Sequence, residues 1–216
     1  MDKFSVIITA GGTSSRYGKT NKLLEYINDK TVIEETVNKF LGFENIDEIV
    51  ICSNNSIINK LNSMFNNNII KIIEGGSTRQ QSVYNGLKTI KNKYVLIHDG
   101  ARPLISREII RKTMDSTIKY HAVSVMTKTT DTIKEVDADG RIIRTIDRSK
   151  LYNTQTPQGF KTLLIKTAHE QLIDGNFTDD CSMLEKLNIP VYIVEGDYTN
   201  IKITVKNDLD FAKLYI

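Results

Sequence analysis

Short apolar runs alternate with helix-compatible segments through the first 126 residues. The apolar runs predict strands over residues 5–9, 48–52, 69–73, 94–98 and 122–126. Between them, apolar positions recur at helical spacing, which predicts helices over residues 31–40, 56–65, 79–90 and 106–120. Strands that alternate with helices indicate an α/β fold, in which a mostly parallel, twisted sheet is flanked by helices on both faces. In such sheets, ligands gather at the carboxyl ends of the strands.

The pattern changes after Met126. Residues 132–136 alternate, residues 137–140 form a turn signal, and residues 141–146 alternate again, which predicts a β-hairpin. Because the hairpin is polar on both faces, we interpret residues 128–148 as a β-arm that reaches onto a partner subunit, with a solvated surface hairpin as the alternative. Helices are predicted over 161–174, 179–187 and 206–215, and strands over 191–195 and 201–204. We expect residues 1–216 to form a single domain.

Composition and charge narrow the class of protein. The chain is 40% hydrophobic and 25% charged, and its net charge of +3 is too small to indicate a surface that coats nucleic acid. Cys52 and Cys181 lack the spacing of a disulfide framework or a zinc site. No apolar run approaches the roughly 18 residues of a membrane span, and the first one has strand length rather than the length of a signal peptide. We expect a reduced, cytoplasmic protein without nucleic-acid or membrane partners.

The loop after the first predicted strand contains a glycine pair, Gly11 and Gly12, directly after Ala10. Glycines let the backbone turn sharply, so that successive N–H groups can point at one anion. Arg16 ends the same loop, and Lys22 adds a second cation. The spacing matches neither a Walker A motif nor Gly-x-Gly-x-x-Gly. A polyphosphate site is therefore the hypothesis here, and an ordinary strand-to-loop turn is the alternative.

A second cluster of polar residues follows the strand predicted at 94–98. Asp99 offers a hard oxygen ligand, and one carboxylate together with substrate phosphates is the usual way in which proteins hold Mg²⁺. Arg102 can pair with a carboxylate or a phosphate. The alternative for Asp99 is a helix cap or a turn residue, and we interpret His98 as structural rather than as a catalytic base.

A second glycine pair, at positions 75 and 76, follows the strand predicted at 69–73. Small polar residues and then a helix come next, and together they offer backbone donors and acceptors that suit the edge of a nucleobase. Further motifs are Asp-Thr-x-Lys (131–134), Asp-Arg (147–148), Thr-Pro-Gln (156–158), Thr-Asp-Asp (178–180) and Asn-Ile-Lys-Ile-Thr (200–204). Taken singly, each has a structural interpretation: Thr178 can cap a helix, for example, and Lys202 can be a solvated lysine.

Taken in order, the eight motifs resemble those of the 2-C-methyl-D-erythritol 4-phosphate cytidylyltransferase family, from Ser5 to Leu209. The resemblance implies a Rossmann-like nucleotidyltransferase fold with a protruding β-hairpin arm, and a homodimer that forms through this arm. It also implies that CTP and the polyol phosphate methylerythritol phosphate react to give diphosphocytidyl-methylerythritol and pyrophosphate, a step of non-mevalonate isoprenoid synthesis. Mg²⁺ or a similar divalent cation is the implied cofactor.

The resemblance implies a role for each matching residue. The pair that stabilises charge on the triphosphate is Arg16 and Lys22, and the metal ligand is Asp99. The nucleotide-binding residues are Ala10, Gly11, Gly12, Gly76, Ser77, Ser82, Gly100 and Arg102. The residues that hold the acceptor phosphate are Thr132, Arg148 and Lys202. Thr156 and Thr178 match further positions that line the site.

The chain departs from the family pattern at three places. Ser14 stands where the loop usually has its second glycine, Asn21 replaces the proline before Lys22 and leaves Lys19 as a competing assignment, and Gly100 replaces an alanine. The nearest rival interpretation is a ribitol-5-phosphate cytidylyltransferase, which shares the fold and CTP. A non-catalytic nucleotide-binding module and a sugar-1-phosphate nucleotidyltransferase are more distant alternatives.

Overall fold

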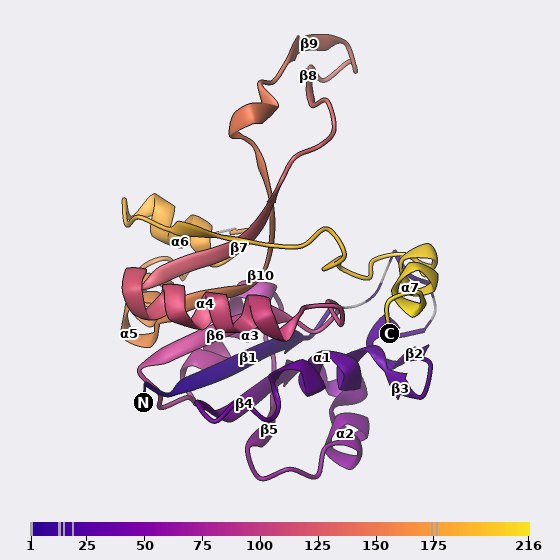
Figure 1. The fold of residues 1–216 in the computed structure, drawn as a ribbon, viewed down its shortest axis with the longest axis vertical. Coiled ribbons are helices and arrows are strands. Elements are labelled where there is room, and N and C mark those ends of the chain that lie inside the picture. The colour runs from indigo at the N-terminus through magenta and orange to yellow at the C-terminus, as the bar shows by residue number, and fades with distance from the viewer. Residues whose placement is uncertain (1, 13, 15, 19, 174, 176) are drawn as a thin grey trace.

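The fold is built around a seven-stranded sheet with the strand order β11-β7-β10-β6-β1-β4-β5 (Figure 1). The computed structural model describes residues 2–12, 14, 16–18, 20–173, 175 and 177–216. The strands are β1 (Phe4–Ala10), β4 (Ile46–Ser53), β5 (Ile70–Glu74), β6 (Tyr94–Asp99), β7 (Ala122–Lys128), β10 (Tyr152–Lys161) and β11 (Tyr192–Glu195). Strand β10 runs antiparallel to β6 and β7, whereas the pairs β1–β4, β1–β6, β4–β5 and β7–β11 are parallel. The predicted α/β class with a mostly parallel sheet is confirmed.

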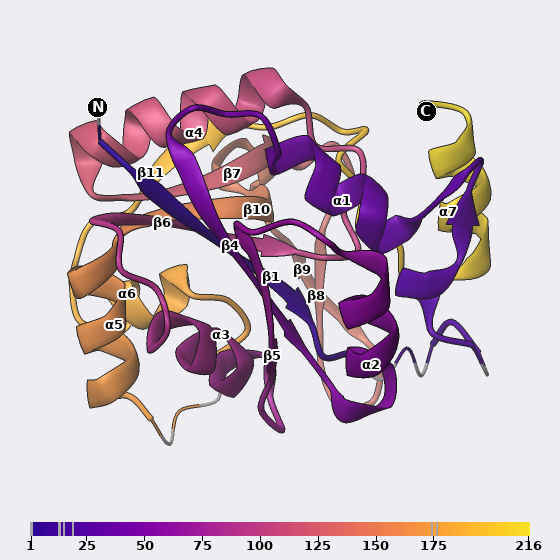
Figure 2. The ribbon, with the colours of Figure 1, turned by 90° about the horizontal axis from the view of Figure 1, so that it is seen from below.

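Helices cover both faces of this sheet (Figure 2). They are α1 (Val32–Phe40), α2 (Asn55–Met64), α3 (Arg79–Leu87), α4 (Arg107–Tyr120), α5 (Thr162–Gln171), α6 (Cys181–Lys186) and α7 (Lys206–Lys213). Successive strand residues point to opposite faces, so Ile49 and Ile51 of β4 pack into one core while Val50 and Cys52 pack into the other. The first core includes side chains of α1, α2 and α4, and the second includes those of α3, α5 and α6.

Local signals in the sequence fix where two of these helices begin. Thr31 and Glu34 form a capping box at the start of α1, and the side chain of Ser106 accepts a hydrogen bond from the backbone of Ile109 at the start of α4. Caps of this kind satisfy backbone donors that have no partner within the helix. Both helices begin within one residue of their predicted positions.

Two predictions at the C-terminal side of the sheet were wrong. Strand β10 was missed, because proline is rare inside strands and Pro157 lies in its middle. Here the ladder between β10 and β7 is irregular between Thr154 and Gln158, which accommodates the proline. Conversely, residues 201–204 were predicted as a strand but are not one; the backbone N–H of Ile203 donates to the carbonyl of Ala101 instead, at 2.8 Å.

The predicted hairpin extends away from the sheet (Figure 1). Its strands β8 (Lys134–Val136) and β9 (Ile142–Thr145) pair antiparallel as a separate two-stranded sheet, and β2 (Tyr26–Ile27) pairs with β3 (Lys30–Thr31) in another. Val136, Ile142 and Ile143 on the arm are all more than half exposed, at 53%, 60% and 56%. Among the described residues, no helix has the length and apolar character that crossing a membrane requires.

Candidate active site

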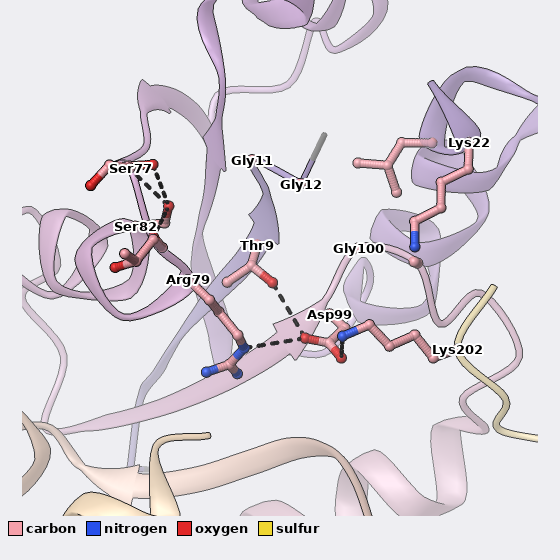
Figure 3. A pocket seen from close by; sticks show the side chains of 14 residues that line it. Thr9, Gly11, Gly12, Lys22, Ser77, Arg79, Ser82, Asp99, Gly100 and Lys202 are labelled. Atoms are coloured by element: carbon pink, nitrogen blue, oxygen red, sulfur yellow. Dashed lines mark hydrogen bonds and ion pairs between the residues drawn. The ribbon is translucent and has the colours of Figure 1, made fainter. Parts of the chain in front are cut away.

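A pocket of about 330 Å³ lies at the carboxyl ends of β1 and β6 (Figure 3). Strands β4 and β5 lie on one side of β1 and β6 lies on the other, so the strand order reverses between β1 and β6. Such a reversal opens a crevice, because the loops that leave the two strands diverge. The lining residues are Thr9, Gly11, Gly12, Lys22, Leu23, Gly76, Ser77, Thr78, Arg79, Ser82, Asp99, Gly100, Ala101 and Lys202.

The carboxylate of Asp99 is surrounded by cations. Its Oδ2 atom lies 2.9 Å from Nζ of Lys202 and 3.5 Å from Nε of Arg102, and its Oδ1 atom lies 3.5 Å from Nε of Arg79. Burial alone would raise the pKa of Asp99, but the positive charges of Arg79, Lys202 and Arg102 outweigh burial and hold this pKa well below its usual range. Asp99 is therefore a carboxylate at neutral pH.

Strand β10 holds the end of β6 through Thr156. The hydroxyl oxygen of Thr156 accepts a hydrogen bond from the backbone N–H of Asp99 at 3.0 Å and lies 3.0 Å from Nδ1 of His98. The Nε2 atom of His98 lies 3.1 Å from the carbonyl of Arg102 and must be the donor there, because a carbonyl only accepts. Burial lowers the pKa of His98 to about 4, so the ring is neutral. Its full burial and its two hydrogen bonds support the structural interpretation.

Lys22 and Lys202 approach the pocket from two segments that lie side by side. Lys22 belongs to a short 3₁₀ helix, Lys22–Leu24, and its Nζ donates to the carbonyl of Ile203 at 2.5 Å. The Lys202 segment is anchored by the buried Asn200, whose amide donates to the carbonyl of Thr156 at 3.0 Å. Burial and then the positive charge of Lys202 lower the pKa of Lys22. Two ammonium groups that line one pocket suit a ligand with several negative charges.

The opposite end of the pocket is formed by backbone and hydroxyl groups. Figure 3 shows Ser77 and Ser82 across the pocket from Lys22 and Lys202. The hydroxyl of Ser82 accepts from the backbone N–H of Gly76 at 3.0 Å and donates to the carbonyl of Thr78 at 2.9 Å. A Cβ atom at Gly76 would lie 2.0 Å from the side chain of Gln81, so the loop requires glycine there. This end offers fixed polar groups without charge, which suits a nucleobase edge.

Comparison with known proteins identifies the family. Residues 4–216 match the family model described as IspD, 2-C-methyl-D-erythritol 4-phosphate cytidylyltransferase. The chain belongs to this family. Proteins with the same name from Clostridium tetani and Prochlorococcus marinus (strain MIT 9301) are 40% and 43% identical, and the alignments cover 100% and 97% of this chain and 91% and 97% of those proteins.

Solved structures of this cytidylyltransferase family share the fold. The 4-diphosphocytidyl-2C-methyl-D-erythritol synthase from Anaerococcus prevotii superposes with a TM-score of 0.87 at 33% identity, covering 99% of this chain and 96% of that one. The 2-C-methyl-D-erythritol 4-phosphate cytidylyltransferase from Francisella tularensis gives 0.84 at 31% identity and covers both chains fully. The resemblance drawn from the motifs is thereby confirmed.

Most of the residues predicted from the cytidylyltransferase motifs line this one pocket. They are Gly11, Gly12, Lys22, Gly76, Ser77, Ser82, Asp99, Gly100 and Lys202. Ala10 ends β1 beside the pocket, and Arg102 contacts Asp99 from outside the lining. Arg16 is exposed on the loop, and its charge contributes to the lowered pKa of Lys22. Lys19, the competitor of Lys22, lies outside the described residues.

The remaining predicted residues lie elsewhere on the chain. Thr132 and Arg148 are exposed on the arm, which leads away from the sheet (Figure 1), and neither lines the pocket of its own chain. Thr178 is exposed ahead of α6, whereas Thr156 acts through the backbone of β6. Within one chain, the residues expected to hold the acceptor phosphate are therefore divided between pocket and arm.

Ser14 makes a left-handed turn at a position where the motif led us to expect glycine. Its backbone has a φ of +56°, in the left-handed region that favours glycine. The Ser14 carbonyl accepts from the backbone of Tyr17 at 2.8 Å, and its hydroxyl accepts from the backbone of Lys22 at 3.3 Å. The serine therefore keeps the turn and adds a link to the helix that carries Lys22.

No role was predicted for Arg79, which lines the pocket. Arg79 stands in the second glycine motif, but its closest ionic partner is Asp180, 101 positions away in the chain. Burial alone would lower the pKa of Arg79, but Asp180 and then Asp99 raise it above its ordinary value. A separation of this kind leaves no local signal, although the Gly-Gly-x-x-Arg and Thr-Asp-Asp motifs each contain one of the two partners.

The donor set of the pocket fits a divalent cation that is bound jointly with phosphates. Among the described residues, no group of three or more histidine, cysteine, aspartate or glutamate side chains could hold a metal ion. Asp99 is the carboxylate that lines the pocket, and it is ionised. One carboxylate beside phosphate oxygens matches the preference of Mg²⁺ for a few protein ligands combined with substrate oxygens.

Proposed function

We propose that the chain is a cytidylyltransferase that joins CTP and 2-C-methyl-D-erythritol 4-phosphate to give 4-diphosphocytidyl-2-C-methyl-D-erythritol and pyrophosphate, a step of non-mevalonate isoprenoid synthesis. One observation carries the proposal: Lys22, Asp99 and Lys202 converge on a single pocket that has an uncharged polar end for a base. Family membership supports the same chemistry. The proposed enzyme acts in the cytoplasm, where its charged substrates are retained.

The proposed reaction needs no general base. A phosphate monoester has a second pKa of about 6, so the acceptor phosphate is mostly a dianion at neutral pH. One of its oxygens forms a bond to the α-phosphorus of CTP, while the bond from that phosphorus to the bridging oxygen breaks. Pyrophosphate leaves with the electron pair. The barrier therefore comes from bringing two anions together and from the charge that develops on the leaving group.

The cations of the pocket can reduce this repulsion and stabilise the charge on the leaving group. Lys22 and Arg16 stabilise the charge on the triphosphate. Because the positive charge of Lys202 acts on Lys22 in the same pocket, an anion that binds to both is favoured. Asp99, with the phosphates, would hold a divalent cation whose charge neutralises phosphate oxygens as a Lewis acid and a template. The glycine loops around Gly11 and Gly76 let the backbone approach the nucleotide closely.

We also propose that the enzyme is a homodimer in which the arm of one chain brings Thr132 and Arg148 to the partner's pocket. Three observations support this: the arm extends away from its own sheet, it exposes apolar side chains, and its two candidate phosphate ligands do not line the pocket of their own chain (Figure 1). Lys202 would then meet the acceptor phosphate from the pocket side.

Pyrophosphate release tests the proposed function. The chain is mixed with CTP and Mg²⁺, and with either methylerythritol phosphate or ribitol 5-phosphate. We expect rapid release in the mixture with methylerythritol phosphate and no release in the mixture with ribitol 5-phosphate. Preference for ribitol 5-phosphate would replace the acceptor but keep the chemistry. Binding of CTP without release in either mixture would mean that the chain is a nucleotide-binding module and would refute the proposed activity.

A further inference from the structure

Arg79 lies between two buried carboxylates, one at each end of its guanidinium group. Its Nη1 atom donates to Oδ2 of Asp180 at 2.7 Å. Its Nε atom is 3.5 Å from Oδ1 of Asp99, an ion pair that Figure 3 shows. The first distance is that of a strong charge-assisted hydrogen bond, and the second is that of a looser ion pair. Arg79 is therefore anchored by Asp180 and only faces Asp99.

Asp180 is itself held by two groups besides Arg79. Its Oδ1 atom lies 3.0 Å from Nε2 of His169, and its backbone N–H donates to the side chain of Gln158 at 3.1 Å. Asp180 and His169 are each only 1% exposed, and the His169 ring stacks on Tyr84 with an angle of 5° between the ring planes. Because one carboxylate oxygen is taken by His169, the other is directed at Arg79.

This anchoring matters because Asp99 faces three cations that compete with any metal ion. Lys202 has a flexible, 41% exposed side chain, which can leave Asp99 for a phosphate. Arg102 is tied to the carbonyl of Asn200 at 2.7 Å. An Arg79 released from Asp180 could form a two-pronged pair with Asp99 and occupy both of the oxygens that a metal ion needs.

We propose that Asp180, oriented by His169, is a positioning residue that holds Arg79 back from Asp99 and so keeps a carboxylate oxygen available to the divalent cation that accompanies CTP. The inference rests on the proposed function, in which Asp99 takes part in holding that cation. Asp180 acts only through Arg79, since it does not line the pocket. The carboxylate of Asp180 also offsets the positive charge of Arg79 beside the proposed cation site.

Calorimetric titration with CTP, without acceptor so that no turnover occurs, tests the inference. The dissociation constant is measured in Mg²⁺ and in EDTA, and its value in EDTA divided by that in Mg²⁺ defines the magnesium ratio. The wild-type ratio should exceed one. Asp180→Asn should lower it about tenfold, the loss typical when a residue that supports a metal ligand is changed. The constant in EDTA should stay the same or fall, because the pocket gains positive charge.

The substitutions are chosen to separate charge from packing. Asparagine at 180 can accept from Arg79 and donate to His169, because the Nδ1 atom of His169 has no hydrogen-bond partner among the described residues and can carry the ring proton instead. Glu185→Gln makes the same charge change at an exposed position of α6 and should leave the ratio unchanged. His169→Phe keeps the ring but loses the donor and should lower the ratio severalfold, whereas His169→Gln keeps a donor and should restore it.

Each outcome has one meaning. If the magnesium ratio of Asp180→Asn equals that of the wild type, Asp180 does not position Arg79 for the cation and the inference is overturned. This includes the case in which both dissociation constants rise by the same factor. If Asp180→Asn does not fold, the two His169 variants provide the test. Equal magnesium ratios for His169→Phe and His169→Gln then overturn the inference. A wild-type ratio of one instead refutes the cation role of Asp99 in the proposed function.

Discussion

At the scale of single residues, Lys22 is the side chain whose place in the pocket is most informative. It is half-buried, it donates to the carbonyl of Ile203, and burial together with Lys202 lowers its pKa. These features hold a positive charge at a fixed point, although burial and Lys202 disfavour the charged form there. An anion that binds beside Lys22 would be stabilised by this preorganised charge.

We therefore expect Lys22→Ala to lower kcat by about 10² to 10³, the usual loss for one preorganised charge contact at a developing anion. The KM for methylerythritol phosphate should change far less, because Lys22 is assigned to the triphosphate. Steady-state kinetics with each substrate varied in turn measures both, and Arg16→Ala should behave alike. Lys60→Ala, on the exposed side of α2, is the control. Equal losses in kcat and in acceptor affinity would contradict the assignment.

Ser14 provides a second prediction, about stability. A non-glycine residue in the left-handed region costs roughly 1 kcal/mol, and Ser14 has a φ of +56°. Ser14→Gly and Ser14→Ala both lose the hydrogen bond from the backbone of Lys22, but only glycine relieves the backbone. Urea unfolding should show the glycine variant to be more stable than the alanine variant by about 1 kcal/mol. Equal midpoints would mean that the loop abandons this turn when the hydroxyl is removed.

At the scale of elements, the contact between β6 and β10 is what presents Asp99. Thr156 of β10 accepts from the backbone of Asp99 and bonds the His98 ring, and it is only 5% exposed. Thr156→Val keeps the shape but removes the hydroxyl, so a buried N–H and a ring nitrogen lose their partner.

Leaving such groups unpaired should lower the free energy of unfolding by about 2 kcal/mol, and the shifted end of β6 should also reduce kcat. Urea unfolding and initial rates measure the two effects. Thr156→Ser restores the hydroxyl and should recover most of both. If the valine variant loses stability but keeps the wild-type rate, the hydroxyl supports the fold without positioning Asp99.

The same elements show how far the sequence could predict the structure. Strands β1, β4, β6 and β7 were predicted because buried strands are short apolar runs. Strand β5 was predicted because three of its five residues are isoleucine. Strand β10 was missed because Pro157 argues against a strand, and the pairing of Arg79 with Asp180 was missed because it joins positions 101 residues apart. Most residues that the motifs pointed to do line one pocket, since the loops that carry them follow the carboxyl ends of the parallel strands.

At the scale of the whole molecule, the pocket and the arm of one chain present complementary halves of the proposed site. Asp99, Lys22 and Lys202 line the pocket, whereas Thr132 and Arg148 lie on an arm that points away from the sheet (Figure 1). In a dimer with twofold symmetry, each arm can serve the other chain, so that every pocket contains residues from both chains.

Mixing two inactive variants tests this arrangement. Arg148→Ala removes the proposed phosphate ligand of the arm and Asp99→Asn removes the proposed metal ligand, so each variant alone should use methylerythritol phosphate poorly. If the arm serves the partner's pocket, a mixed dimer has one pocket with both Asp99 and Arg148 intact. Random pairing after subunit exchange at equal concentrations should then restore about one quarter of the wild-type activity. Glu135→Gln, an arm change that spares Arg148, should leave activity near the wild-type level. Mixtures no more active than the separate variants would show that arm and pocket do not act across the dimer.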